Sequence, residues 1–349
     1  AAGIETDTLD YSASFSWLDG PAIFRYWNLR IGGRSLPCVP APDLLRPARL
    51  RRALEILRFL RVTAGETRGR EALDAMTVRE YLDAAGFSRR FQDEFVLPAY
   101  AGVCTCSYRS LCDYPASVLL AFVGGGLASA TMHRARGGAR DVVARLSAPV
   151  REVRVATPVA ALAEADGGVR VTPEDGVPEH FDHVVIATQA SHAGPILPAA
   201  AEAERAILAR FRYEQFELVV HGDRRLAPQG AAPRTPVNFV LAPGSDAPMA
   251  TIVLNGIHRS LGDEPAVYET WNPLRAPDPA TVYCRVGLDR PVVGRDSLRA
   301  IAELDALQAA PDRRIWFCGS YAAFGVPLQE TAAASALAVA ARLGIDGLP

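Results

Sequence analysis

The segment near the carboxy terminus constrains the fold more than any other part of the 349-residue chain. The run at residues 314–318, which is apolar after Arg314, predicts a buried strand that ends at Gly319, and an alanine-rich helix is predicted over residues 330–343. A glycine directly after a strand lets a ligand approach the backbone, and the first turn of a helix offers free N–H groups and a positive dipole end. The segment indicates either a ligand-binding loop or an ordinary strand–loop–helix unit packed by small residues.

The pattern changes once along the rest of the chain. Residues 43–147 predict mainly helices, because leucines recur at helical spacing and Thr77 begins a capping box with Glu80. From residue 151 onward, short alternating or apolar runs predict strands at 153–155, 169–171, 181–188, 216–221, 237–241, 250–255 and 281–286. We therefore expect an α/β protein with an additional α+β part.

Composition excludes several classes of protein. Hydrophobic residues make up 49% of the chain and charged residues 22%, which is enough to bury the cores of two domains. A net charge of -2 without a basic block argues against a nucleic-acid partner. The longest uncharged run, residues 115–132, predicts a buried helix and a glycine loop rather than a membrane span.

Reactive side chains are few. The chain contains no lysine, which excludes a lysine Schiff base. Cys104, Cys106 and Cys112 have irregular spacing without a matching pair, so we expect buried thiols and no metal site. His180 and His183 are expected to have surface or structural roles. Six scattered cysteines and the absence of a signal-peptide pattern at the start predict a cytoplasmic location.

Two further segments have features that suit a ligand. The strand at Val159 follows a proline, and the apolar run 181–188 ends in the small residues Ala187 and Thr188, which would let a cofactor pass closely. Any parallel strand could have the same composition. Paired glycines at 137–138 begin a predicted helix, where backbone N–H groups could hold an anion, although loops of this composition are common.

Taken together and in this order, the three segments resemble the carboxy-terminal three quarters of the flavin amine-oxidase and phytoene-desaturase superfamily. Within it, the chain is most similar to a bacterial group of predicted NAD/FAD-binding proteins. Smaller similarities extend the resemblance over nearly the whole chain, and they lie at residues 9–16, 97–98 and 211–213. The resemblance implies an FAD-dependent oxidoreductase that transfers a hydride between flavin N5 and its substrate.

The resemblance also implies which residues contact FAD. Val159 would lie against the adenine ring, and the helix after the Gly319 loop would point its amino terminus at the flavin pyrimidine, stabilising the reduced ring. No catalytic residue is assigned. The implied cofactor-binding residues are Arg136, Gly137, Gly138, Val159, Ala187, Thr188, Gly319, Ser320, Tyr321, Gln329, Glu330 and Thr331.

The expected domains follow from the same comparison. An FAD-binding, Rossmann-like domain would combine residues 131–189 and 298–349, while residues 1–130 would form the mainly helical part and 190–297 the sheet part of a substrate domain. Apolar and aromatic residues in the substrate domain favour a lipophilic small molecule, such as an acyl chain or a polyene. An amine oxidase is the alternative, with Tyr321 and Phe324 as candidates for an aromatic cage. A non-catalytic fragment or a partner-binding subunit is another.

The chain departs from the family in three places. Family members begin with a strand and a Gly-x-Gly-x-x-Gly turn that holds the FAD pyrophosphate, and this sequence contains no such turn. We expect a missing amino-terminal segment or a partner chain to complete the site. After Gly325 the family's aromatic residue and His-Glu-Asp-Gly are replaced by Val-Pro-Leu-Gln-Glu. Many amine oxidases also hold a water at N5 with a lysine, which this chain lacks.

Overall fold

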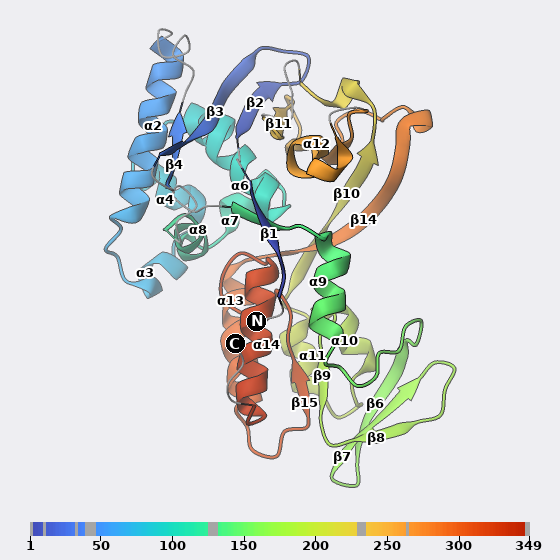
Figure 1. Ribbon diagram of the computed structural model, residues 1–349. Coiled ribbons are helices and arrows are strands. Elements are labelled where there is room, and N and C mark those ends of the chain that lie inside the picture. Colours follow the sequence, from blue (N-terminus) through green and yellow to red (C-terminus); the bar gives the residue numbers. More distant parts are fainter. Residues whose placement is uncertain are drawn as a thin grey trace. The chain divides into compact units, whose positions relative to one another are not determined.

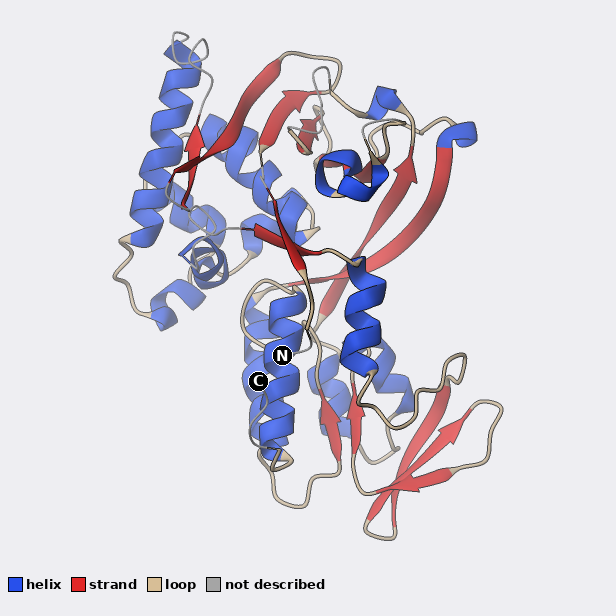
Figure 2. Ribbon diagram, in the orientation of Figure 1, coloured by secondary structure: helices blue, strands red, loops and turns tan. Residues whose placement is uncertain are grey.

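The computed structural model describes residues 3–9, 12–31, 34–38, 47–124, 132–228, 235–262 and 265–345 (Figures 1 and 2). Parts of the similarity at residues 9–16 and of the uncharged run 115–132 lie outside these ranges. No helix within the described ranges is long and apolar enough to cross a membrane. The chain forms a mixed α/β fold of two compact units, which are described separately below.

Unit 1 combines Ala1–Glu5, Ala135–Tyr213 and Pro291–Pro349. Its strands are β6 (Val159–Ala165), β7 (Gly168–Pro173), β8 (Glu179–Phe181), β9 (Val184–Ile186) and β15 (Ile315–Phe317). Its helices are α9 (Gly138–Ser147), α10 (Ala190–Ile196), α11 (Glu202–Leu208), α13 (Arg295–Gln308) and α14 (Gln329–Arg342). Strands β6, β7 and β8 form an antiparallel sheet.

Strands β9 and β15 pair in parallel although about 130 residues separate them in the chain. Ile315 lies beside Val184, and Phe317 lies beside Ile186. The side chains of Ile186 and Phe317 are buried in one core with residues of α10, α11 and α13. The two strands therefore belong to one unit although a long stretch of chain separates them.

Unit 2 combines Thr6–Arg134 and Glu214–Arg290. Strands that lie wholly or mostly in it are β1 (Thr6–Leu9), β2 (Ala13–Trp17), β3 (Ala22–Ile31), β4 (Arg34–Cys38), β5 (Met132–Ala135), β10 (Arg212–His221), β11 (Val237–Leu241), β12 (Met249–Val253), β13 (Tyr268–Trp271) and β14 (Val282–Val292). Eight of them form one sheet in the order β14-β10-β13-β12-β11-β2-β3-β4, and β1 pairs with β5.

The helical part of unit 2 lies between β4 and β5. Its helices are α2 (Pro47–Ala64), α3 (Arg70–Asp74), α4 (Val78–Ala84), α5 (Arg89–Phe91), a π-helical turn (Gln92–Val96), α6 (Leu97–Cys104), α7 (Tyr108–Asp113) and α8 (Ala116–Phe122), and the short α12 (Leu254–Ile257) follows β12. The capping box predicted at Thr77 is confirmed. The Thr77 hydroxyl accepts a hydrogen bond from the Glu80 amide, and the Glu80 carboxylate accepts one from the Thr77 amide.

One face of the large sheet is aromatic. Phe15 of β2 is buried between Phe239 of β11 and Phe95 of the π-helical turn, with ring centroids 5.0 and 5.2 Å away. Gly102 of α6 lies so close to Phe239 that a Cβ at this glycine would lie 2.4 Å from the ring. The sheet and the helices of unit 2 therefore share one core.

The opposite face of this sheet has a row of buried polar side chains. The Asp223 amide donates to Nδ1 of His221 (3.1 Å), so the neutral ring keeps its proton on Nε2 and donates it to Thr270 (2.8 Å). Thr270 then donates to Thr251 (3.0 Å), whose hydroxyl donates to the Leu226 carbonyl (2.9 Å). Protonation of the ring would place a hydrogen on Nδ1, which could then no longer accept from the Asp223 amide, so this arrangement requires a neutral His221.

We expect this row to make the stability of unit 2 depend on pH. Burial lowers the pKa of His221 below its ordinary value. The unfolded chain therefore binds a proton at His221 before the folded chain does, so stability is full above about pH 6.5 and falls as the pH drops below that value. Urea unfolding of the protein and of His221→Gln at several pH values measures the effect. Identical slopes of stability against pH in the two proteins would contradict it.

Some predictions about the elements were wrong. Residues 153–155 form no strand, and the side chains of Val153 and Val155 are 60% and 82% exposed. Ala156 has a left-handed backbone (φ 53°) and Pro158 lies two residues later, so the strand begins only at Val159. The strand predicted at 250–255 ends at Val253, and the four strands between residues 6 and 38 were not predicted.

The borders of the two units differ from the predicted domain boundaries. Unit 1 begins its second segment at residue 135 and continues through residue 213, and its third segment begins at residue 291. The predicted boundaries were 131, 190 and 298. The difference arises because α10 and α11 pack with α13 on the core around β9 and β15.

Candidate functional site

All twelve residues proposed to contact FAD belong to unit 1. They lie at five positions in the fold. Arg136, Gly137 and Gly138 precede or begin α9, Val159 begins β6, Ala187 and Thr188 follow β9, Gly319, Ser320 and Tyr321 follow β15, and Gln329, Glu330 and Thr331 begin α14.

The loops after β9 and β15 begin at the same end of the parallel pair, where both strands have their carboxyl ends. The Cys318 amide donates to the Ile186 carbonyl (3.1 Å), and a Cβ on Gly319 would lie 3.8 Å from the Thr188 carbonyl oxygen. Ala187 and Thr188 are exposed there. The structure thus brings together Ala187, Thr188 and Gly319, three residues that sequence reasoning took from two distant segments.

Gly319 occupies a position that only glycine suits. Its φ of 151° is a conformation that residues with a Cβ rarely adopt, and a Cβ there would lie 2.9 Å from Cε1 of Tyr321. The space of the missing side chain is taken by the Tyr321 ring, and Gly319 itself is half-buried. A glycine backbone is one that a flat ligand can approach closely.

Ser335 fixes the Gly319 loop to α14. The Gly319 amide donates to the Ser335 hydroxyl (2.9 Å), and that hydroxyl donates to the Gly319 carbonyl (3.0 Å). Sequence reasoning did not select Ser335. Its position in the predicted helix could have identified it, because Ser335 lies four residues after Thr331 and therefore on the same face of α14.

At the beginning of α14 the three predicted residues divide into two groups. Gln329 and Glu330 are exposed in the first turn of this 14-residue helix, where backbone N–H groups and the positive dipole end are available. Thr331 is buried, and its hydroxyl bonds to the backbone of Val326 (3.1 Å) and Leu328 (3.0 Å). The Thr331 hydroxyl therefore shapes the loop, while Gln329 and Glu330 face solvent.

Tyr321 lies inside the core of unit 1. Its ring centroid is 4.8 Å from that of Phe211, and burial raises the pKa of Tyr321 well above its ordinary value. Its hydroxyl is buried without a hydrogen-bond partner among the described residues. An unsatisfied buried hydroxyl costs about 1 to 3 kcal/mol. The oxygen is enclosed by the core of unit 1, so the structure does not present it to a ligand.

The glycine pair before α9 already has a negative charge beside it. The Asp141 side chain lies against Gly137, where an added Cβ would be 2.5 Å from it, and Arg145 bonds to the Asp141 carboxylate (2.9 Å). Arg136 forms an ion pair with Glu5 (2.7 Å). The beginning of α9, which the sequence suggested as an anion-binding position, thus has an acidic side chain in its first turn.

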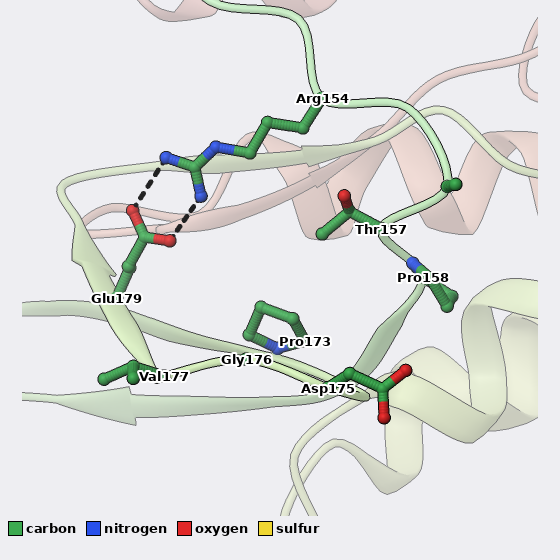
Figure 3. A pocket seen from close by; sticks show the side chains of 9 residues that line it. Arg154, Thr157, Pro158, Pro173, Asp175, Gly176, Val177 and Glu179 are labelled. Atoms are coloured by element: carbon green, nitrogen blue, oxygen red, sulfur yellow. Dashed lines mark hydrogen bonds and ion pairs between the residues drawn. The ribbon is translucent and has the colours of Figure 1, made fainter.

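A small hollow adjoins the beginning of β6, next to Val159 (Figure 3). Its volume is about 210 Å³, which is below the range of about 300 to 1,000 Å³ that small-molecule sites occupy. Arg154 bonds to Glu179 across its rim (3.1 Å), and this guanidinium lowers the pKa of the Glu179 carboxyl. The hollow could receive part of a ligand but not a whole substrate. Its lining residues are Arg154, Ala156, Thr157, Pro158, Pro173, Asp175, Gly176, Val177 and Glu179.

These observations fit the flavin end of FAD better than its pyrophosphate. The Gly319 backbone and the exposed first turn of α14 suit a flat ring with polar edges. The sequence contains no Gly-x-Gly-x-x-Gly turn for the pyrophosphate. Within the described ranges, no group of three His, Cys, Asp or Glu side chains could hold a metal ion.

Solved structures resemble the whole chain. Cyclohexylamine oxidase from Brevibacterium oxydans IH-35A shares 15% identity with a TM-score of 0.58, over 98% of this chain and 84% of that one. A putative protoporphyrinogen oxidase from Exiguobacterium sp. 255-15 shares 15% with a TM-score of 0.59, over 98% and 83%. A fatty acid isomerase from P. acnes shares 15% with a TM-score of 0.61, over 96% and 80%. Identities this low establish the fold alone.

A family model settles the relationship. No curated protein sequence matches the chain. The model of the flavin-containing amine oxidoreductases matches residues 12–218, more than half of the 349 residues. This match confirms the resemblance found in the sequence. The chain belongs to the family of flavin-containing amine oxidoreductases.

Proposed function

We propose that this chain is the larger part of an FAD-dependent oxidoreductase that transfers a hydride between flavin N5 and a lipophilic small molecule. The proposal depends on the end of the parallel pair where the carboxyl ends of β9 and β15 lie together. Gly319, whose backbone conformation favours glycine, and the beginning of α14 follow β15 there. Family membership supports the cofactor. Unit 1 would be the FAD-binding domain of Rossmann-like type, and unit 2 the substrate domain.

Bound FAD would supply the hydride acceptor, and the chain's own residues would position it. Gly319 and Thr188 would let the ring pass close to the backbone, and Tyr321 would support the Gly319 loop from the core. The free N–H groups at the beginning of α14 would stabilise negative charge on the pyrimidine side. Because the chain has no lysine, positioning and the protein's electric field replace the lysine-bound water of many amine oxidases.

We also propose that a segment outside this chain, or a partner chain, completes the FAD site. Helix α9 has no buried residue, and Val143 and Leu146 on it are 63% and 59% exposed. Val185 of β9 is 42% exposed, although strands of parallel sheets are normally covered on both faces. The solved structures above extend 16 to 20% beyond the part that this chain covers. A further layer on unit 1 would cover these apolar side chains and hold the pyrophosphate.

The substrate is proposed to be an acyl chain or a polyene. Apolar and aromatic residues dominate the interior of unit 2, and one structure of similar fold is a fatty acid isomerase. Amine oxidation is the second candidate, since cyclohexylamine oxidase and putrescine oxidase also share the fold. An aromatic cage for an amine would use Tyr321 and Phe324. The Tyr321 ring is not available for it, because it packs against Phe211 in the core.

Anaerobic mixing of the FAD-loaded protein with substrates separates these candidates. We expect a long-chain acyl compound or a polyene to bleach the absorbance of the oxidised flavin, and a primary amine to leave it unchanged. Bleaching by amines alone would replace the lipophilic substrate with an amine. Bleaching by neither class would favour the non-catalytic, partner-binding alternative.

A further inference from the structure

Strand β14 (Val282–Val292) is an open edge of the large sheet (Figure 1, orange). Within the described part of the chain it has one neighbour, β10, and no strand pairs with its other side. The five residues 283–287 are all exposed, including the side chains of Tyr283 (61%) and Val286 (38%). Since successive strand residues point to opposite faces, both faces of β14 are exposed there.

An open edge of this length can pair with another strand. The backbone N–H and C=O groups along a sheet edge form a template, which proteins usually protect with charged residues, proline or a covering loop. Strand β14 has three charged residues, namely Arg285, Asp289 and Arg290. Their spacing decides which strand could pair with this edge.

A second copy of β14 matches the edge in one antiparallel register. With a two-fold axis through Gly287, Arg285 of each copy lies directly opposite Asp289 of the other, which gives two opposite-charge pairs. On the other face, Val286 lies opposite Leu288 twice, beside the axis. Directly opposite residues have Cβ atoms about 4.5 to 5.5 Å apart, close enough for both kinds of pair to interact.

Neighbouring symmetric registers lack this match. An axis through Arg285 or through Asp289 places that residue opposite its own copy, so like charges meet. An axis through Val286 or Leu288 places Arg285 opposite Gly287 or Pro291, and no opposite charges face each other. The sequence of β14 therefore selects the register centred on Gly287.

The neighbouring strand adds to the charge pattern. Arg285 bonds to Glu217 of β10, and the side chains of the two residues remain 47% and 39% exposed. A second carboxylate from the opposite copy would extend this pair into a row of alternating charges. From these observations we infer that β14 is an interface through which two copies of this chain form one continuous antiparallel sheet, with the two-fold axis at Gly287.

A short strand pair buries less surface than a standard stable interface, so the dimer should be weak and should depend on concentration. Sedimentation equilibrium over a wide range of protein concentration measures it without any cofactor. We expect Arg285→Asp and Asp289→Arg each to weaken dimerisation by about tenfold or more, because each change turns both opposite-charge pairs into like-charge pairs.

Mixing the two variants provides the decisive measurement. One copy then has Asp at 285 and 289 and the other has Arg at both, so two attractive pairs form again. The mixture should dimerise, and so should the double variant Arg285→Asp/Asp289→Arg. Circular dichroism checks that each variant is folded, and Arg299→Asp on α13, an exposed change of the same charge, should leave dimerisation unchanged.

A chemical cross-link tests the position of the axis. Gly287→Cys, combined with Cys284→Ser to remove the neighbouring thiol, should give a disulfide-linked dimer under mild oxidation, because two copies of residue 287 meet at the axis. The inference is overturned if the protein is monomeric at every concentration or if the mixture of variants dimerises no better than either alone.

Discussion

Replacement of Gly319 by valine is expected to weaken FAD binding by about tenfold or more, since each 1.4 kcal/mol corresponds to a factor of about ten. The φ of 151° at Gly319 disfavours any residue with a Cβ, and the new Cβ would lie 2.9 Å from Tyr321 and 3.8 Å from the Thr188 carbonyl. Holding such a conformation costs about 1 to 3 kcal/mol. The loop would therefore move away from the position that brings backbone to the flavin.

A matched control separates this effect from strain alone. Gly167 in the turn between β6 and β7 also has a positive φ, 75°, and no atom within 4 Å of an added Cβ. Gly167→Val should lose a similar amount of stability and keep its flavin. The measurement is the ratio of flavin to protein absorbance in the FAD-completed protein, beside a circular dichroism spectrum. Equal occupancy in both variants would mean that the Gly319 loop has only a structural role.

Truncation of Phe15 to alanine should destabilise unit 2 by about 3 to 5 kcal/mol. Phe15 is 1% exposed and packs against Phe95 and Phe239, so alanine leaves a cavity where the sheet meets the helices. The three rings lie on three different elements. Neither the sheet nor the π-helical turn can close the cavity without breaking its own hydrogen bonds.

Urea unfolding measures this loss, and two other variants calibrate it. Phe15→Leu keeps most of the volume and should lose about 1.5 kcal/mol or less. Phe181→Ala removes a side chain that is 43% exposed and should cost clearly less than Phe15→Ala. A loss below about 1 kcal/mol for Phe15→Ala would show that the aromatic face is not a packed core.

Local signals predicted the elements that depend on neighbouring residues. The helix at Thr77 has its cap and its partner Glu80 within one turn, and α14 was predicted from its alanines to within one residue at each end. Strand β2 has the period-two pattern of a strand, with Ala13 and Phe15 buried and Ser14 between them, but it was not predicted. Its partners in the sheet, β11 and β3, lie elsewhere in the chain.

Contacts between distant segments could not be predicted from the residues alone. The parallel pairing of β9 with β15 was not predicted, because nothing in either strand specifies the other, and the resemblance to a family placed the two segments only in one domain. The bonds from Ser335 to Gly319 and the left-handed Ala156 depend on how the loops fold back. For the same reason the sequence did not predict that the Thr331 hydroxyl donates to the loop carbonyl of Val326, since its position at the start of a helix does not indicate this bond.

Titration of FAD tests the central claim most directly. The chain alone should bind FAD weakly, because its residues fit the flavin end and lack the pyrophosphate turn. The protein expressed with its upstream coding sequence, or with the partner chain that completes the site, should bind about one FAD per chain and be yellow. A completed protein that remains colourless after incubation with excess FAD would contradict the account.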